Sequence, residues 1–181
     1  MLVPAFAAVA ISFGTATASA EASDHISRSA YACLAQPIVT VDADIVDVAV
    51  SNPAFSTLVT AVTAAGLVDT LKGPGPFTVF APTDAAFAAL PSLLLNAALS
   101  DPRGLLTGVL TYHVASGLYD PRRALVPREI RSVQGQGLFL SNNRGGAGVN
   151  QSNVNCQGIR AKNGLIWVID SVLLPQFPSA N

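Results

Sequence analysis

Apolar residues recur at helical spacing in the first half of the chain and in short consecutive runs in the second half. Three helices are predicted from apolar positions three and four residues apart. The first covers 45–49, the second runs from its predicted cap Asn52 to Gly66, and the third starts at Asp101 with Pro102 in its first turn. All three therefore carry an apolar face that must be buried.

The apolar runs predict strands. A short strand is expected at 77–80, ended by Pro82, and Thr83 then offers its side-chain oxygen to the open amides of a following helix. Asp84 is expected to interact with the positive end of that helix. From Ile130 onward, runs rich in Val, Ile, Leu and Phe are divided by glycines, which predicts antiparallel strands with tight turns. Helices followed by strands favour an α+β domain over repeated βαβ units.

The first 20 residues have the composition of an export signal. They contain no charged side chain and end in Ala18-Ser19-Ala20, the small-residue pattern that precedes signal-peptidase cleavage. We interpret 1–20 as a signal peptide. No Lys or Arg precedes the apolar run, and its length passes the threshold of roughly 18 residues for a membrane span, so an uncleaved anchor is the alternative.

The length of 181 residues fits one domain. We place this domain at 41–175, between an N-terminal tail at 21–40 and a C-terminal tail at 176–181. No membrane span is expected after signal cleavage.

Export changes the interpretation of Cys33 and Cys156, the two cysteines of the chain. An even number of cysteines in an oxidising compartment favours a disulfide over free thiols. The bond would attach the N-terminal segment to a late strand and stabilise the fold by roughly 5 kcal/mol at most. Two buried, unpaired cysteines are the alternative.

Charge argues against nucleic-acid binding. Ten Lys and Arg residues face eleven Asp and Glu residues, so no positive excess is available to neutralise phosphates. Basic residues concentrate at Arg122, Arg123, Arg128 and Arg131. We interpret this concentration as a solvated loop face. A patch for an acidic glycan or another anionic partner is the alternative.

The sequence offers little catalytic chemistry. Its two histidines are His25 in the tail and His113, and no nucleophile elbow, zinc-protease helix, P-loop or dinucleotide fingerprint occurs. Asp42, Asp44 and Asp47 cluster at a predicted helix start, where capping explains them, and they lack the register of a calcium loop. We therefore predict no enzymatic activity, no metal site and no cofactor.

Three segments resemble the fasciclin-type domain in order and spacing. They are FTVFAPTDAAF at 77–87, LTYHV at 110–114 and NGLIWVIDSVLLP at 163–175. The resemblance covers roughly 40–175, and with the export signal and two cysteines the chain is similar to small secreted bacterial members of the mycobacterial antigen type. This resemblance implies an antiparallel β-sandwich-like wedge flanked by several helices.

The resemblance also identifies motif residues. Thr83 and Asp84 fall in the first motif, and Tyr112 and His113 match a central Tyr-His pair whose surroundings are linked to receptor binding in related adhesive proteins. Because a histidine on an apolar helical face usually makes a buried hydrogen bond, we expect His113 to bond toward the Thr83-Asp84 junction. Direct contact of His113 with a partner is the alternative.

The function implied by the resemblance is adhesion or binding at the cell surface, outside the cell or in the periplasm. The expected partner is an extracellular or envelope protein or glycan. The alternative is a carrier of an apolar small molecule such as a carotenoid or lipid, because some fasciclin-type proteins carry carotenoids and half of this chain is hydrophobic. Asn150 starts an Asn-Gln-Ser sequon, which is a glycosylation site only in a eukaryotic source and otherwise a polar turn.

Overall fold

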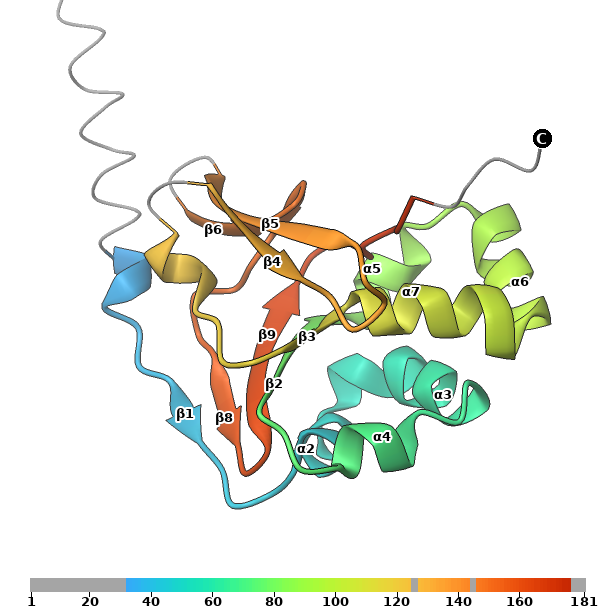
Figure 1. The fold of residues 1–181 in the computed structure, drawn as a ribbon, viewed down its shortest axis with the longest axis horizontal. Helices are drawn as coiled ribbons and strands as arrows, with labels where there is room; N and C mark the ends of the chain where they lie inside the picture. The colour runs from blue at the N-terminus through green and yellow to red at the C-terminus, as the bar shows by residue number, and fades with distance from the viewer. Residues whose placement is uncertain (1–31, 125–126, 144–145, 177–181) are drawn as a thin grey trace, which may run out of the picture.

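The computed structural model describes residues 32–124, 127–143 and 146–176 (Figure 1). The predicted signal peptide, His25 and most of both predicted tails lie outside these residues. The helices, in chain order, are α2 (Ile45–Ser51), η1 (Pro53–Phe55), α3 (Ser56–Ala64), α4 (Val68–Lys72), α5 (Asp84–Ala88), α6 (Ser92–Ser100), η2 (Pro102–Leu106), α7 (Thr107–Tyr112) and η3 (Pro121–Arg123).

Two sheets contain the strands of the described chain. Sheet A has five strands in the order β1-β8-β9-β2-β3, and sheet B has four in the order β4-β5-β6-β7. The strands are β1 (Val39–Thr40), β2 (Phe77–Pro82), β3 (Val114–Ser116), β4 (Arg128–Arg131), β5 (Gly137–Asn143), β6 (Gly146–Val149), β7 (Ser152–Asn153), β8 (Ile159–Ala161) and β9 (Gly164–Ile169).

The strand directions only partly match the expected antiparallel sandwich. Every pair in sheet B is antiparallel, as are β2–β3 and β8–β9. In sheet A, however, β2 pairs parallel to β9 from Phe77↔Gly164 to Pro82↔Ile169, and β1 pairs parallel to β8. These parallel partners are far apart in sequence, so no tight turn between them signals the pairing. The α+β class with helices flanking the sheets is confirmed, and the two parallel pairs of sheet A are an addition to the expected antiparallel pairing.

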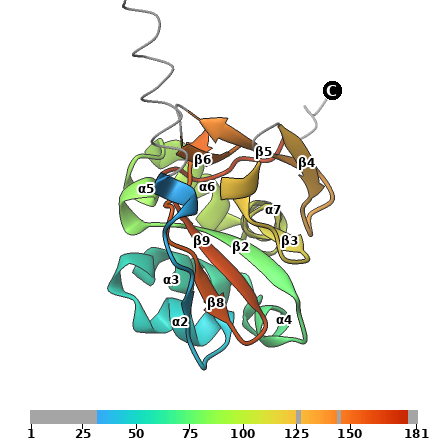
Figure 2. The same ribbon diagram turned by 90° about the vertical axis from the view of Figure 1, so that its left-hand side faces the viewer.

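Sheet A is the middle layer of the domain. On β2, Val79 and Ala81 join a core with the helices, whereas Phe80 joins a second core that includes Leu138 and Val149 of sheet B. Because strand side chains alternate between faces, β2 must be apolar at successive positions to fill both cores. In Figure 1 the helices lie to the right of sheet A and sheet B lies above it, and Figure 2 shows the same layers from the side.

The helix starts depend on local capping. Asp44 accepts a hydrogen bond from the Asp47 amide at the start of α2, and Asn52 accepts from the Ala54 amide at the start of η1. Asp101 caps the third predicted helix, which begins as the π-helical turn η2 before continuing as α7. The short helices α4 and α6 were not predicted. No single helix of the described chain is long and apolar enough to cross a membrane, and α2 with η1–α3 passes only as a pair bent by 105°.

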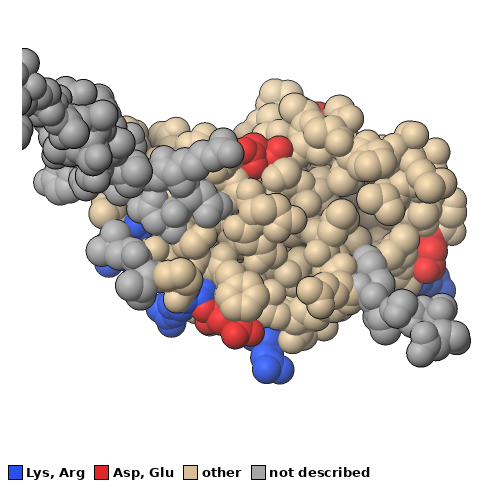
Figure 3. Space-filling view, turned by 90° about the horizontal axis from the view of Figure 1, so that it is seen from above, with Lys and Arg blue, Asp and Glu red and all other residues tan. Residues whose placement is uncertain are grey.

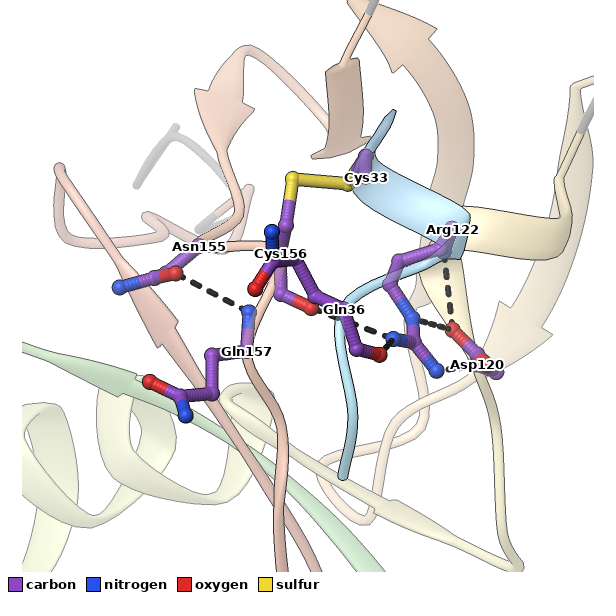
Figure 4. The surroundings of a disulfide bond; sticks show 7 residues. All are labelled: Cys33, Gln36, Asp120, Arg122, Asn155, Cys156 and Gln157. Carbon is purple, nitrogen blue, oxygen red and sulfur yellow. Dashed lines mark hydrogen bonds and ion pairs between the residues drawn. A yellow bond between two sulfur atoms is a disulfide. The ribbon is translucent and has the colours of Figure 1, made fainter. Parts of the chain in front are cut away.

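A disulfide joins Cys33 to Cys156 across 123 positions of sequence. Arg122 lies beside it, with its guanidinium donating to the carbonyls of Gln36 and Cys156 and paired to the Asp120 carboxylate (Figure 4). Only 5% of the Arg122 side chain is exposed. The prediction of a solvated basic face is therefore wrong for Arg122, because a neighbouring carboxylate and two carbonyls make its burial favourable.

Candidate functional site

The Thr83-Asp84 junction connects two helices. The Thr83 hydroxyl accepts a hydrogen bond from the Ala86 amide and so caps α5, as the sequence predicted. The Asp84 carboxylate instead reaches the start of α3, accepting from the Ser56 hydroxyl at 2.6 Å and the Thr57 amide at 2.8 Å. These hydrogen bonds, that from Ser56 foremost, lower the pKa of Asp84. The junction thus holds α3 against α5.

His113 lies in the core at the end of α7 and is 2% exposed. Its Nδ1 donates to the Val109 carbonyl at 2.8 Å, and its Nε2 accepts from the Leu173 amide at 2.9 Å. This arrangement requires the neutral imidazole, and burial lowers the pKa of His113 to about 4. The expected buried hydrogen bond is present, but it ties α7 to the segment after β9 rather than to the Thr83-Asp84 junction.

Tyr112 connects α7 to sheet B. Its hydroxyl donates to the Gly137 carbonyl at 3.0 Å and accepts from Asn150 Nδ2 at 2.9 Å. Asn150 also accepts from the Phe139 amide at 2.9 Å and has a φ of 51°, in the left-handed region that asparagine tolerates. The Nδ2 atom, which N-glycosylation would modify, is thus a donor in a contact between helix and sheet.

The motif residues therefore sit inside the domain or at helix starts. Tyr112 and His113 are both less than a tenth exposed, so neither presents its side chain at the surface. Among the described residues, no three His, Cys, Asp or Glu side chains converge as metal ligands would. The arrangement around the motifs packs helices against each other and against the sheets.

An apolar cavity of about 290 Å³ lies between the helices and sheet A. Side chains from α2, α3, α4, β2 and α7 line it, among them Ile45, Leu58, Val62, Leu71 and Val79. The sequence predicts an apolar stripe on α3, and we expected this stripe to pack in the hydrophobic core. Because α4 was not predicted, the wall that encloses this cavity was missed.

The polar rim of this cavity includes Asp47 of α2 and Lys72 of α4. Lys72 Nζ lies 2.9 Å from Asp47 Oδ1 and 3.7 Å from Asp44 Oδ2. The hydrogen bond to Asp47 and the two carboxylate charges raise the pKa of Lys72. This ion pair therefore links α2 to α4 beside an apolar interior.

A comparison with known families decides what kind of domain this is. The model of the fasciclin domain matches residues 53–175. The chain belongs to the fasciclin family. The matched segment runs from η1 to the residues that follow β9, and so contains both sheets except β1. The fasciclin domain therefore includes all four motif residues, Thr83, Asp84, Tyr112 and His113.

Relatives of this fasciclin domain occur in bacteria. It is 46% identical over 132 residues to the Synechocystis sp. protein named Uncharacterized protein sll1735, covering 72% of this chain and 97% of the relative. It is 38% identical over 130 residues to the cell surface glycolipoprotein MPB83 of Mycobacterium bovis, covering 69% of this chain and 57% of the relative.

A solved structure supports the fold of this fasciclin domain. The FAS1 domain pair of the insect cell adhesion molecule Fasciclin I matches with a TM-score of 0.50 at 16% identity. The match covers 68% of this chain and 46% of the other. At this identity the likeness concerns the fold alone.

Proposed function

We propose that this fasciclin domain is a non-catalytic interaction module that binds a protein or glycan at the cell surface or outside the cell. The Cys33–Cys156 disulfide supports this location, because such bonds persist in oxidising compartments. The name of the mycobacterial relative, a cell surface glycolipoprotein, supports it as well. Adhesion-related roles are typical of the fasciclin family.

The apolar outer surface of α6 carries this proposal. Leu93 is 79% exposed, Leu94 43% and Leu99 47%, although Leu95 and Ala98 of the same helix pack on the core. No charged residue occurs between Asp84 and Asp101. Exposed apolar surface of this kind is typical of interaction sites. Figure 1 shows α6 at the outer edge of the helical layer, and uncharged side chains cover most of the face in Figure 3.

The test is saturable binding of the purified protein to intact cells, matrix and envelope fragments of its source. We expect the double substitution Leu93→Ser and Leu99→Ser to weaken binding about tenfold, as removal of a central apolar contact does. The thermal midpoint should change little, because both side chains face solvent. Val50→Ser on α2 is the control, since Val50 is also apolar and exposed. No saturable binding, or equal binding by the double variant, would contradict the proposal.

A second candidate, a carrier of an apolar small molecule, is favoured by the cavity beside α3. Its volume of about 290 Å³ lies near the lower end of the range for ligand pockets, roughly 300–1,000 Å³. Such a volume suits a short acyl chain or a single ring system, whereas a carotenoid would extend beyond it. The apolar lining provides the transfer free energy that such a ligand needs.

Filling this cavity tests the carrier hypothesis. Val59 lines the cavity, so Val59→Phe is expected to lower the affinity for the neutral apolar dye Nile red at least about tenfold. Val39→Phe on β1 is the matched control, because Val39 is exposed and lies outside the cavity lining. Protein purified from its source should also release an apolar molecule on solvent extraction. Absence of both dye uptake and an extractable molecule would eliminate this candidate.

A further inference from the structure

A second cleft, of about 380 Å³, opens where the two sheets meet beside η3. Three arginines from three different elements line it: Arg123 of η3, Arg128 of β4 and Arg160 of β8. The other described residues of the wall are Tyr119 and Asp120 with the apolar side chains Ile38, Leu118, Ala124, Leu140 and Leu165. Arg123 and Arg128 are close together in the sequence, whereas Arg160 lies near them only in the folded protein.

Positive charge in this cleft is poorly balanced. Among the described residues that line the cleft, Asp120 is the one acidic residue, and its carboxylate already pairs with the buried Arg122 at 2.8 Å. Arg123 lies 3.5 Å from the same carboxylate but keeps 81% of its side chain exposed. Within the described chain, neither Arg128 nor Arg160 forms an ion pair. The cleft therefore presents three guanidinium groups against a carboxylate that is already neutralised.

Arg128 is held by an aromatic contact. Its guanidinium carbon lies 5.7 Å from the centre of the Tyr119 ring, within the range of a cation–π interaction. This contact leaves the N–H groups of Arg128 without a carboxylate partner in the described chain. They are therefore available to an anionic ligand.

The walls of the cleft are fixed before any ligand binds. Arg122 donates to the Gln36 carbonyl at 2.6 Å and to the Cys156 carbonyl at 3.3 Å, next to the disulfide (Figure 4). Thr40 pairs with Arg160 across the β1–β8 ladder, and Trp167 Nε1 donates to the Tyr119 carbonyl at 2.9 Å. A cleft built this way avoids much of the ordering cost of binding.

We propose that this cleft binds an acidic saccharide, with Arg123, Arg128 and Arg160 pairing its carboxylate or sulfate groups. A guanidinium group can donate two parallel hydrogen bonds to two oxygens of a planar carboxylate or of a tetrahedral sulfate group. The apolar part of the wall, including Ile38 and Leu140, suits the C–H face of a sugar ring. The inference rests on the proposed function in one respect, because it names a glycan as the partner.

Other anionic polymers fit the cleft less well. A nucleic acid needs positive charge along an extended surface, whereas this chain has a net charge of -1. An extended acidic peptide commonly adds to a free sheet edge, and the edge strand beside the cleft, β1, has only two residues. The end of a saccharide chain requires neither an extended positive surface nor a free sheet edge.

The test is calorimetric titration of the purified protein with oligogalacturonate and with a heparin-derived oligosaccharide, against neutral maltohexaose. We expect saturable binding of at least one acidic oligosaccharide, no binding of maltohexaose, and roughly tenfold weaker binding for Arg128→Ala and for Arg160→Ala. Both side chains are exposed, so both variants should keep the wild-type thermal midpoint. Arg131→Ala is the control, because Arg131 is an exposed arginine of β4 outside the cleft.

Three outcomes would overturn this proposal: no binding of either acidic oligosaccharide, equal weakening by Arg131→Ala, or preferential binding of a poly-glutamate peptide. Saturable cell binding that depends on Leu93 and Leu99 but not on Arg160 would leave the interaction module in place without an acidic saccharide in the cleft. Acidic saccharide binding without that cell binding would support the cleft and contradict the role of α6.

Discussion

Replacing Arg122 with alanine is expected to lower the free energy of unfolding by about 3–5 kcal/mol, the usual cost of removing one partner from a buried ion pair. The Arg122 side chain makes a two-pronged contact with Asp120, Nε to Oδ1 at 2.9 Å and Nη2 to Oδ2 at 2.8 Å. Its third nitrogen, Nη1, donates hydrogen bonds to the carbonyls of Gln36 and Cys156. Alanine would remove the charged donor that the Asp120 carboxylate and these two partly buried carbonyls share.

Arg122 also packs on the largest side chain of the core. Its guanidinium carbon lies 4.9 Å from the centre of the Trp167 ring, and Trp167 is fully buried. Loss of the arginine therefore opens space beside Trp167 and also leaves the Asp120 carboxylate, which is 15% exposed, without its main partner. Both the open space and the unpaired carboxylate lower the free energy of unfolding.

Denaturant unfolding with the disulfide intact measures this effect. Arg123→Ala is the matched control, because Arg123 is the next residue and contacts the same carboxylate at 3.5 Å but is exposed. We expect it to cost less than about 1 kcal/mol. The double variant Arg122→Met with Asp120→Asn should recover part of the loss, since it removes both charges. Equal costs for Arg122→Ala and Arg123→Ala would show that the buried pair does not stabilise the fold.

Local features of this fold could be predicted from the sequence. The caps at Asn52, Thr83 and Asp101 were predicted because each bonds to an amide within four residues. The Cys33–Cys156 bond was predicted because the chain offers one pairing. These features depend on short-range chemistry or on counting, and neither requires knowledge of the tertiary structure.

Contacts between distant segments could not be predicted in the same way. The amide that bonds His113 belongs to Leu173, 60 positions away, and any backbone amide looks the same in sequence. Arg122 resembled its exposed neighbours because its burial depends on Gln36 and Cys156. Helix α6 was missed because its leucines and alanines spread over more than one face of the helix, so no clear amphipathic period marks it. The basic patch predicted from the sequence did not include Arg160, because β8 brings that residue to the cleft from a distant part of the chain.

Acidification is expected to destabilise this protein through His113. The folded-state pKa of His113 is lowered to about 4 by burial, against an ordinary value of 6.5. Between these two values the unfolded chain binds a proton that the folded protein does not. The stabilisation is therefore complete above pH 6.5 and is lost as the pH falls toward 4, by about 3 kcal/mol in total.

Carboxylates do not produce the same dependence in this window. The pKa of Asp44 is lowered mainly by the Asp47 amide, and that of Asp84 by the Ser56 hydroxyl. A depressed carboxyl pKa contributes stability above its ordinary value of 3.8 and loses it below that value. The loss of stability from these carboxylates therefore begins near pH 4, where the loss from His113 ends.

Urea unfolding of the wild type and of His113→Gln at several pH values between 7 and 4 separates these contributions. The variant should be less stable at pH 7, because it loses hydrogen bonds with Val109 and Leu173, but its stability should vary little down to pH 4.5. His25→Gln is the control, since His25 is the other histidine of the chain and should leave the wild-type slope unchanged. If the wild type and His113→Gln lost stability in parallel, the buried imidazole would not be the group that titrates.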